Sequence, residues 1–402
     1  MLGSVLESLA EAPAVALLGA RQVGKTSLAR QVARAWQGPA TIFDLESPAT
    51  REALSAAPER LLRSCEGLVI LDEVQRMPPL FELLRPICDA PDRKAVFLLL
   101  GSASWDLVQG VSETLAGRIL FVDMGGFSMA EVGAGQQDKL WLRGGFPRAW
   151  LAPSAPAWRR WMEAFTRTYL ERDLPGLDPK VAPEALGRFW RMLAHYHGQT
   201  WNAAELARSM DAGVRAVNRY RDLLAGSFML RVLPPWFENL GKRLVKSPKV
   251  YLRDSGILHF LLGIDSLQAL YLHPSYGASW EGFALEQVLA AFGDRQAYFY
   301  GTQRGAELDL LLLRRGARWG FEFKCADAPQ TTKSMRVAIG DLGLEHLWVV
   351  YPGEIEYPLA DKITALPLRK IGDLRGAGLG NIDVAAPSGP EATTPPLRGT
   401  PP

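Results

Sequence analysis

The glycine-rich stretch from Gly19 to Thr26 restricts the possible folds of this chain more than any other feature. It places four free positions between two glycines and ends in Gly-Lys-Thr, which is the pattern of a phosphate-binding loop. The apolar run before it, Ala14–Leu18, predicts a short buried strand, and residues 26–35 predict a helix. Because backbone N–H groups at the start of such a helix point toward an anion, the stretch predicts a strand–loop–helix unit that binds phosphate.

The loop residues divide the expected work between backbone and side chains. Glycine lets the backbone wrap closely around phosphate groups. We expect Lys25 to reach the β- and γ-phosphates of a nucleotide and Thr26 to ligate Mg²⁺. The residues predicted to bind the nucleotide are Gly19, Arg21, Gln22, Val23, Gly24, Lys25, Thr26 and Ser27.

A second motif follows the apolar run Leu68–Leu71, which ends in Asp72 and Glu73. A parallel core strand delivers acidic side chains to a nucleotide in this way. Asp72 is predicted to hold Mg²⁺ through water, and Glu73 is predicted to polarise the attacking water. Taken alone, the acidic pair also fits a solvated strand end, but the two motifs together predict nucleotide binding.

Residues 1–130 alternate short apolar runs with helical stretches, which predicts a parallel sheet covered on both faces. The expected strands are Ala14–Leu18, Thr41–Asp44, Leu68–Leu71, Val96–Leu100 and Ile119–Asp123. Ser102 follows the fourth strand and either senses the γ-phosphate or belongs to a simple turn. Arg118 is either an arginine finger for a neighbour's nucleotide or a structural surface arginine.

The middle of the chain is predicted to be helical from about residue 130 to 200 and to form a winged helix-turn-helix over 199–233. Asn202 is placed to cap the first helix, and residues 214–224 form the second. That second helix carries Arg215, Arg219 and Arg221, and residues 201–260 contain ten Lys or Arg against five Asp or Glu. This charge fits a nucleic-acid face, and packing between domains is the alternative.

A third pattern of charged residues lies between residues 275 and 352. Glu281 falls on the apolar stripe of a predicted helix, so an acid faces inward there. Asp309 precedes an apolar strand, while Glu322 and Lys324 share one face of the next strand. This layout is typical of the PD-(D/E)xK nuclease core, in which the two acids bind a divalent metal ion and the lysine activates water or steadies phosphate charge. Glu281 is placed to complete the metal shell; the alternative is a solvated hairpin face with a Glu–Lys pair.

Composition indicates the class of protein and the compartment in which it is expected. Hydrophobic residues make up 48% and charged residues 22%, as in an ordinary globular protein, and the net charge of +2 favours no particular partner. Three scattered cysteines favour a reducing compartment, and no apolar run is long enough to span a membrane. We therefore expect a cytoplasmic protein with no membrane partner and a disordered tail over residues 375–402.

These segments together resemble the prokaryotic AAA-type P-loop ATPases that carry a C-terminal domain of unknown function related to restriction-endonuclease-like folds. The matching segments are Gly19–Thr26, Leu71–Arg76, Leu115–Arg118, Gly144–Pro147, Thr168–Asp173, Arg253–Gly256, His273–Pro274, Trp280–Glu286, Gly305–Asp309 and Glu322–Lys324. The resemblance implies ATP binding and ATPase activity, with ATP and Mg²⁺ as cofactors.

The sequence thus predicts an α/β fold with a P-loop NTPase parallel sheet over residues 1–130, a helical and winged-helix-like region over 131–270, a restriction-endonuclease-like α/β domain over 271–374 and the tail. The candidate catalytic residues are Lys25, Glu73, Asp309, Glu322 and Lys324, and the candidate metal ligands are Thr26, Asp72, Asp309 and Glu322.

The leading hypothesis is a Mg²⁺-dependent ATPase that acts as a switch on DNA or a DNA-bound partner. One alternative is a DNA nuclease whose ATP site gates cleavage. The other is a switch that binds a protein partner through an inactive nuclease-like domain. All three hypotheses are compatible with an oligomer.

Overall fold

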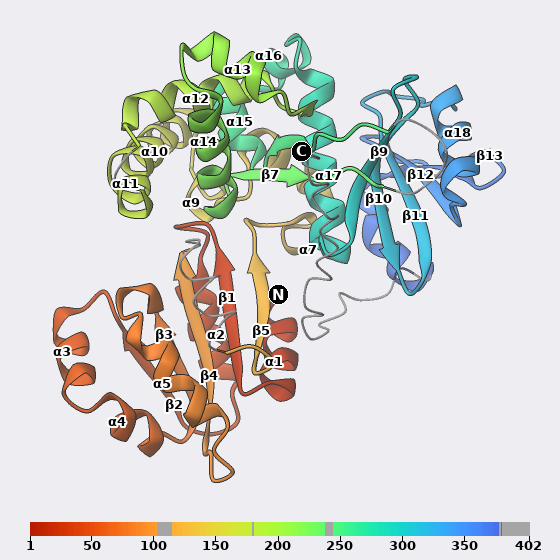
Figure 1. Cartoon of the computed structure of the whole chain (residues 1–402). Helices are drawn as coiled ribbons and strands as arrows, with labels where there is room; N and C mark the ends of the chain where they lie inside the picture. Colours follow the sequence, from red (N-terminus) through yellow and green to blue (C-terminus); the bar gives the residue numbers. More distant parts are fainter. Residues whose placement is uncertain (103–114, 179–180, 238–243, 378, 380–402) are drawn as a thin grey trace, which may run out of the picture.

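The computed structural model describes residues 1–102, 115–178, 181–237, 244–377 and 379. An N-terminal α/β part, a helical part and a second α/β part follow one another along the chain (Figure 1). Most of the expected tail lies outside the described residues. The 3-10 helix η4 (Leu368–Ala377) and the buried Leu379 extend a few residues beyond the expected start of the tail at about residue 375, and the tail itself stays a prediction.

The N-terminal part contains the five-stranded, fully parallel sheet that the sequence predicts, and its strand order is β2-β3-β4-β1-β5. Its strands are β1 (Ala14–Gly19), β2 (Ala40–Asp44), β3 (Gly67–Asp72), β4 (Ala95–Ser102) and β5 (Ile119–Met124). Its helices are α1 (Leu2–Glu11), α2 (Lys25–Ala35), α3 (Pro48–Ala56), α4 (Pro58–Ser64), η1 (Val74–Arg76) and α5 (Pro79–Cys88).

Alternation along β1 shows why both faces of this sheet are covered. Val15 and Leu17 pack in one apolar cluster with residues of α1 and α2. Ala16 and Leu18 pack on the other face with residues of α3, α4 and α5. Since all five strands run parallel, their carboxyl ends meet at one edge of the sheet. The arrowheads of β1 and β5 point from this edge toward the helical part (Figure 1).

The helical part forms its own apolar core and includes a small antiparallel sheet of order β6-β8-β7. Its helices are α7 (Met129–Val132), η2 (Ala134–Gln136), α8 (Gln137–Arg143), α9 (Pro147–Trp150), α10 (Ala155–Thr168), η3 (Tyr169–Asp173), α11 (Leu174–Leu177), α12 (Pro183–His195), α13 (Ala203–Met210), α14 (Val214–Gly226), α15 (Ser255–Leu262) and α16 (Leu267–Tyr271). Its strands are β6 (Gln199–Thr200), β7 (Leu230–Leu233) and β8 (Lys249–Leu252).

The two helices and the strand expected between residues 202 and 233 are present as α13, α14 and β7. The side chain of Asn202 caps α13 by accepting the Glu205 N–H at 3.3 Å. The connection from β7 to β8 packs on the edge of strand β9, because the Trp236 N–H donates to the Phe299 carbonyl at 2.7 Å and the Val245 N–H donates to the Gly301 carbonyl at 2.9 Å. The described ends of this connection therefore lie against the C-terminal sheet.

The C-terminal part is built on a mixed six-stranded sheet of order β13-β14-β12-β11-β10-β9. Its elements are α17 (Tyr276–Phe292), β9 (Ala297–Gly301), β10 (Glu307–Arg314), β11 (Ala317–Phe323), α18 (Lys333–Leu342), β12 (His346–Tyr351), β13 (Tyr357–Ala360) and β14 (Ile363–Pro367). Helix α17 shares an apolar cluster with Leu310 and Phe321, and α18 shares another with Leu308 and Leu311, so the two helices cover opposite faces. Among the described residues, no helix is both long enough and apolar enough to cross a membrane.

Two of the motifs quoted for the family resemblance meet in space. The Asp254 carboxylate accepts the Gly145 N–H at 2.8 Å and also caps α15 by accepting the Ile257 N–H at 2.9 Å. A Cβ atom at Gly256 would lie only 2.1 Å from the carbonyl oxygen of Arg143. A larger residue at Gly145 or Gly256 would therefore clash with nearby backbone. The motifs Gly144–Pro147 and Arg253–Gly256 form a joint between α8 and α15.

Candidate functional site

The phosphate-binding loop connects β1 to α2 at the carboxyl edge of the sheet. Gln22 with φ of 63° and Gly24 with φ of 108° both adopt the left-handed conformation. Such residues turn successive N–H groups toward one point and form an anion-binding concavity. Gly19 is also fixed by space, since a Cβ atom there would lie 2.3 Å from the Met124 carbonyl oxygen. The local geometry is that of a loop able to surround phosphate.

Lys25 is the first residue of α2 and is only 6% exposed. Its ammonium group donates to the carbonyl oxygens of Gly19 at 2.8 Å and Ala20 at 2.9 Å. Burial lowers the pKa of Lys25 to about 8, although the nearby carboxylates of Glu73 and Asp72 oppose this shift. A phosphate group would offer this ammonium charged oxygens in place of two neutral carbonyls.

Thr26 and Asp72 form the oxygen pair expected of a magnesium site. The Thr26 hydroxyl donates to Asp72 Oδ2 at 2.8 Å. Burial raises the pKa of the Asp72 carboxyl, and its Oδ1 atom is buried with no hydrogen-bond partner in the described part of the chain. Hard hydroxyl and carboxylate oxygens are the ligands that Mg²⁺ prefers, and the orphaned oxygen leaves a lone pair for such an ion. The residues present therefore fit Mg²⁺.

Glu73 follows β3 in the left-handed conformation, with φ of 58° and ψ of 49°. This backbone is uncommon for a residue with a side chain, and such strain gathers at functional sites. The Glu73 carboxylate accepts from the side-chain amide of Gln75 and, at 3.4 Å, from the hydroxyl of Ser102. The Gln75 amide also donates to Ser102 Oγ at 2.9 Å. Ser102 thus lies beside the predicted catalytic acid, which favours the sensor interpretation. No separate role was predicted for Gln75, which contacts both side chains.

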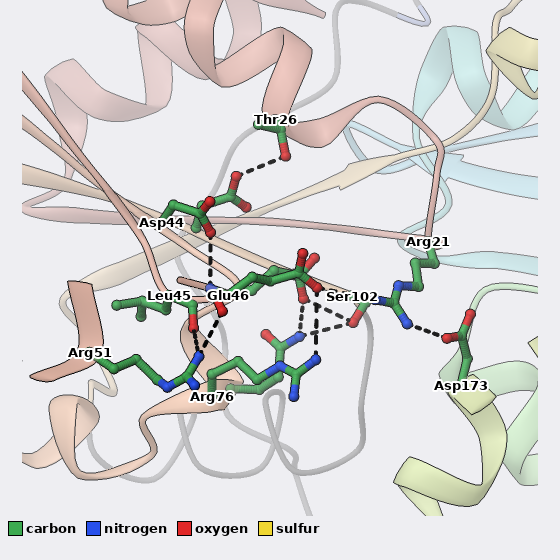
Figure 2. A network of polar contacts seen from close by, with 12 residues as sticks. Arg21, Thr26, Asp44, Leu45, Glu46, Arg51, Arg76, Ser102 and Asp173 are labelled. Carbon is green, nitrogen blue, oxygen red and sulfur yellow. Dashed lines mark hydrogen bonds and ion pairs between the residues drawn. The ribbon is translucent and has the colours of Figure 1, made fainter. Parts of the chain in front are cut away.

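A polar network connects the loop to the helical part (Figure 2). The Arg21 guanidinium donates to Asp173, the last residue of the π-helical turn η3, and to Glu46 at 3.2 Å. Glu46 also lies 3.8 Å from the Arg76 guanidinium, and Arg51 donates to its carbonyl oxygen at 2.9 Å. Sequence reasoning placed Arg21 in the loop but did not find its partners.

Apolar packing ties the loop to the same helical part. Ala20 and Val23 are 5% and 2% exposed and belong to one cluster with Phe146 of the loop before α9 and Phe165 of α10. Two of the side chains between the loop glycines therefore sit in the core of the neighbouring part. Because protein cores are closely packed, a change in the conformation of the loop would shift the side chains of these helices.

Arg118 lies at the opposite edge of the sheet from the loop. Its carbonyl accepts the N–H of Ala14 at the start of β1, whereas the loop follows the end of that strand. Its side chain pairs with Asp89. Arg118 therefore cannot reach a nucleotide in its own loop, and a role as an arginine finger stays a prediction that needs a second copy of the chain.

The structure brings together the acids and the lysine predicted in the C-terminal part. Asp309 and Glu322 lie on the antiparallel strands β10 and β11, and the Lys324 ammonium contacts Glu322 Oε1 at 2.7 Å. Asp309 Oδ2 accepts the Phe323 N–H at 3.0 Å. Burial, together with the charge of Asp309, raises the pKa of Glu322 to about 8. Glu322 Oε2 is buried without a partner among the described residues.

Three neighbouring acids, Glu281, Glu307 and Asp309, form what we call the C-terminal acidic cluster. A lysine that the sequence did not single out contacts all three. Lys249 of β8 donates to Glu281 Oε1 at 3.2 Å and Asp309 Oδ1 at 3.5 Å, and it also pairs with Glu307. The Tyr251 hydroxyl donates to Glu281 Oε1 at 2.7 Å. The sequence signal that could have found them is alternation along the strand just before the Arg253–Gly256 motif, which places Lys249 and Tyr251 on the same strand face.

In this region a lysine ammonium already contacts two of the acids that could ligate a metal ion. Within the described ranges, no group of three or more His, Cys, Asp or Glu side chains is arranged to hold a metal ion. Glu281 instead contacts Lys249 and Tyr251. The roles of Asp309, Glu322 and Lys324 in nuclease chemistry stay predictions.

The arginines of α14 are partly engaged within the molecule. Arg219 pairs with Asp178 through two nitrogens, and Arg221 lies 5.2 Å over the Trp201 ring while pairing with Asp222 at 2.7 Å. Arg215 is exposed. Two of the three arginines on the predicted nucleic-acid face therefore already pair with acids of the same chain, so the positive charge of this face is smaller than the sequence count suggests.

Three family descriptions cover most of the chain. Residues 11–133 match an AAA domain. Residues 135–268 and 276–371 match two domains of unknown function, DUF8612 and DUF4143.

Whole-chain relatives and solved structures extend this comparison. The chain is 46% identical over 364 residues to the uncharacterised proteins Rv2008c of Mycobacterium tuberculosis and Mb2031c of Mycobacterium bovis, covering 90% of this chain and 82% of each relative. A Walker-type ATPase of Pyrococcus abyssi is 17% identical and matches 65% of this chain and 94% of its own, with a TM-score of 0.46. The RuvB Holliday junction branch migration motor of Thermotoga maritima is 19% identical and matches 58% of this chain and 89% of its own, with a TM-score of 0.30.

Proposed function

Because the chain belongs to the same family as Rv2008c of Mycobacterium tuberculosis and carries an AAA domain, we propose that it is a Mg²⁺-dependent ATPase that acts as a switch on DNA or a DNA-bound partner. The observation that carries the proposal is the meeting of Lys25, the Thr26–Asp72 pair and Glu73 at one edge of one sheet. In this proposal the chain has three domains, over about 1–130, 131–270 and 271–374.

Each residue of this edge has a defined part in the proposal. The loop amides and Lys25 bind the phosphates, and Thr26 and Asp72 hold Mg²⁺, which when bound neutralises charge on the phosphate oxygens. Glu73 orients the attacking water, and Ser102 lies close enough to Glu73 to respond to the γ-phosphate. The buried position of Lys25 strengthens its attraction for phosphate because little water screens it.

The switch part of the proposal is supported by Arg21. Its guanidinium holds Asp173 from within the phosphate-binding loop. A phosphate group arriving in this loop competes with Asp173 for the arginine, since both are anions. Nucleotide binding is thereby connected to the turn η3 and to the helices that follow it.

Phosphate release from ATP tests the enzymatic part. Wild-type protein with Mg²⁺ should release phosphate, and Lys25→Ala should abolish release because the phosphates lose their cation. Lys94→Ala is the matched control, since Lys94 is an exposed lysine that pairs with Glu66 far from the loop. Equal turnover by wild type and Lys25→Ala would exclude this assignment.

Turnover with and without DNA tests the choice of partner. Double-stranded and single-stranded DNA should raise ATP turnover if the switch acts on DNA, and the stimulation should fall with salt because phosphate contacts dominate such binding. Arg215→Ala should reduce the stimulation without changing turnover in the absence of DNA, because Arg215 is exposed on α14. No stimulation and no retention of DNA would assign the partner to another class of macromolecule.

A gated nuclease is the second candidate, and it is favoured by the proximity of Asp309, Glu322 and Lys324. Asp309→Ala should then remove Mg²⁺-dependent DNA cleavage while sparing ATP hydrolysis. The absence of cleavage by wild type on linear, nicked and single-stranded DNA would defeat this candidate. The presence of Lys249 among the acids speaks against it.

A further inference from the structure

We infer that Lys249 is the resident cation of the C-terminal acidic cluster, so that this cluster joins β8 to the C-terminal part instead of holding a divalent metal ion. The inference does not depend on the proposed ATPase activity. It concerns residues that come from the small sheet of the helical part, from α17 and from β10.

The contact distances fit an ammonium ion. Lys249 is 6% exposed, and its Nζ lies 3.2 Å from Glu281 Oε1 and 3.5 Å from Asp309 Oδ1, with Glu307 also paired to it. A divalent ion of the Mg²⁺ or Ca²⁺ type holds its oxygen ligands at about 2.0–2.6 Å. The described residues contain no group of three acidic or histidine side chains arranged for that shorter geometry.

Both carboxylate oxygens of Asp309 already accept a hydrogen bond in this arrangement. Its Oδ1 atom accepts from Lys249, and its Oδ2 atom accepts the Phe323 N–H at 3.0 Å. A divalent ion bound between Asp309 and Glu322 would lie close to the Lys249 ammonium, which would keep its pairs with Glu281 and Glu307 but would compete with the ion for Asp309. Because like charges repel, the buried ammonium disfavours a divalent ion at Asp309.

The same contacts explain why β8 is held where it is. Tyr251 lies two residues after Lys249 on the same strand face, and its hydroxyl donates to Glu281 Oε1 at 2.7 Å. The connection that precedes β8 is bonded to the edge of β9 through Trp236 and Val245. Polar contacts on a strand face and backbone contacts along an edge thus hold the small sheet against the C-terminal part.

Metal binding by the nucleotide-free full-length chain is the first test. Mn²⁺ is titrated and the bound ion counted by electron paramagnetic resonance, in an Asp72→Asn background that removes the loop site. We expect no bound Mn²⁺ that depends on Asp309. One Mn²⁺ per chain that is lost on adding Asp309→Asn would overturn the inference.

Charge coupling between Lys249 and Asp309 is the second test. Lys249→Met should lower the melting temperature, and adding Asp309→Asn should restore a large part of the loss, because the second change removes the acid left unpaired. Lys94→Met is the control, since Lys94 is an exposed lysine that pairs with Glu66 in the N-terminal part. Its effect should instead add to that of Asp309→Asn.

Both outcomes of the second test are decisive. If the effects of Lys249→Met and Asp309→Asn simply add, the lysine does not neutralise this acid and the inference fails. If Lys249→Met does not fold, the double variant becomes the readout. Its recovery as a soluble, cooperatively melting protein supports the inference, and its failure to fold overturns it.

Discussion

At the residue scale, Lys25 shows how burial sets the chemistry of one side chain. In the free protein the pKa of Lys25 is about 8 because burial outweighs the nearby carboxylates. Bound phosphate adds negative charge and favours the protonated form, so ATP binding takes up a proton whenever Lys25 is neutral in the free protein. ATP affinity should therefore be constant below the pKa and fall as pH rises through it, by up to about tenfold per pH unit.

Equilibrium titration of ATP between about pH 7 and pH 9.5 checks this prediction across the pKa of Lys25. Lys25→Met binds ATP more weakly at every pH and should lose the dependence. Arg30→Met is a suitable control, because Arg30 lies on the exposed side of the same helix. A flat profile for the wild type would show that Lys25 keeps its proton throughout.

The sequence identified the residues of the loop but not their distant partners. Gly24, Lys25 and Thr26 are adjacent in the sequence, so the local pattern alone was enough to identify the loop. Asp173 lies 152 positions from Arg21, and Lys249 lies 60 positions from Asp309. No local period or motif links positions so far apart, and only the folded chain brings them together.

At the scale of elements, strands with strong apolar runs were predictable and short amphipathic pieces were not. All five strands of the first sheet appear within two residues of their expected bounds. Helix α1 was not predicted, because it offers only Val5 and Leu9 as fully buried apolar side chains. Strands β13 and β14 were also missed, since they depend on pairing with β12 within the second sheet.

The joint between α8 and α15 yields a prediction at this scale. Gly256→Ala should lower the free energy of unfolding by about 1–3 kcal/mol, because the new methyl group meets the Arg143 carbonyl oxygen and the backbone must shift. Urea unfolding measures the loss. Gly277→Ala is the matched control, because Gly277 is also helical and a Cβ atom there meets nothing within 4 Å. An equal effect of both substitutions would contradict the role of the close approach.

At the scale of the whole molecule, polar pairs connect parts that are distant in sequence. Arg231 of β7 pairs with Glu286 of α17 and with Asp294 at 3.1 Å, which adds a further contact between the helical and C-terminal parts. The loop reaches the helical part through Arg21 and through the packing of Ala20 and Val23. A change at the nucleotide site therefore has a continuous path of contacts into the helical part, and whether it propagates is an experimental question.

The Arg21–Asp173 pair allows this path to be tested. In hydrogen–deuterium exchange, ATP with Mg²⁺ should alter the exchange of residues 169–177 in the wild type, because phosphate competes for Arg21. Asp173→Asn keeps the shape of the side chain but removes its charge, so the turn should no longer respond to ATP. ATP affinity should not fall, because phosphate no longer competes with this carboxylate for Arg21. Glu171→Gln is the control, since Glu171 lies in the same turn and pairs with the exposed Arg167 at 3.0 Å. If Asp173→Asn and the wild type respond alike, the nucleotide signal travels through the packing of Ala20 and Val23 instead of the ion pair.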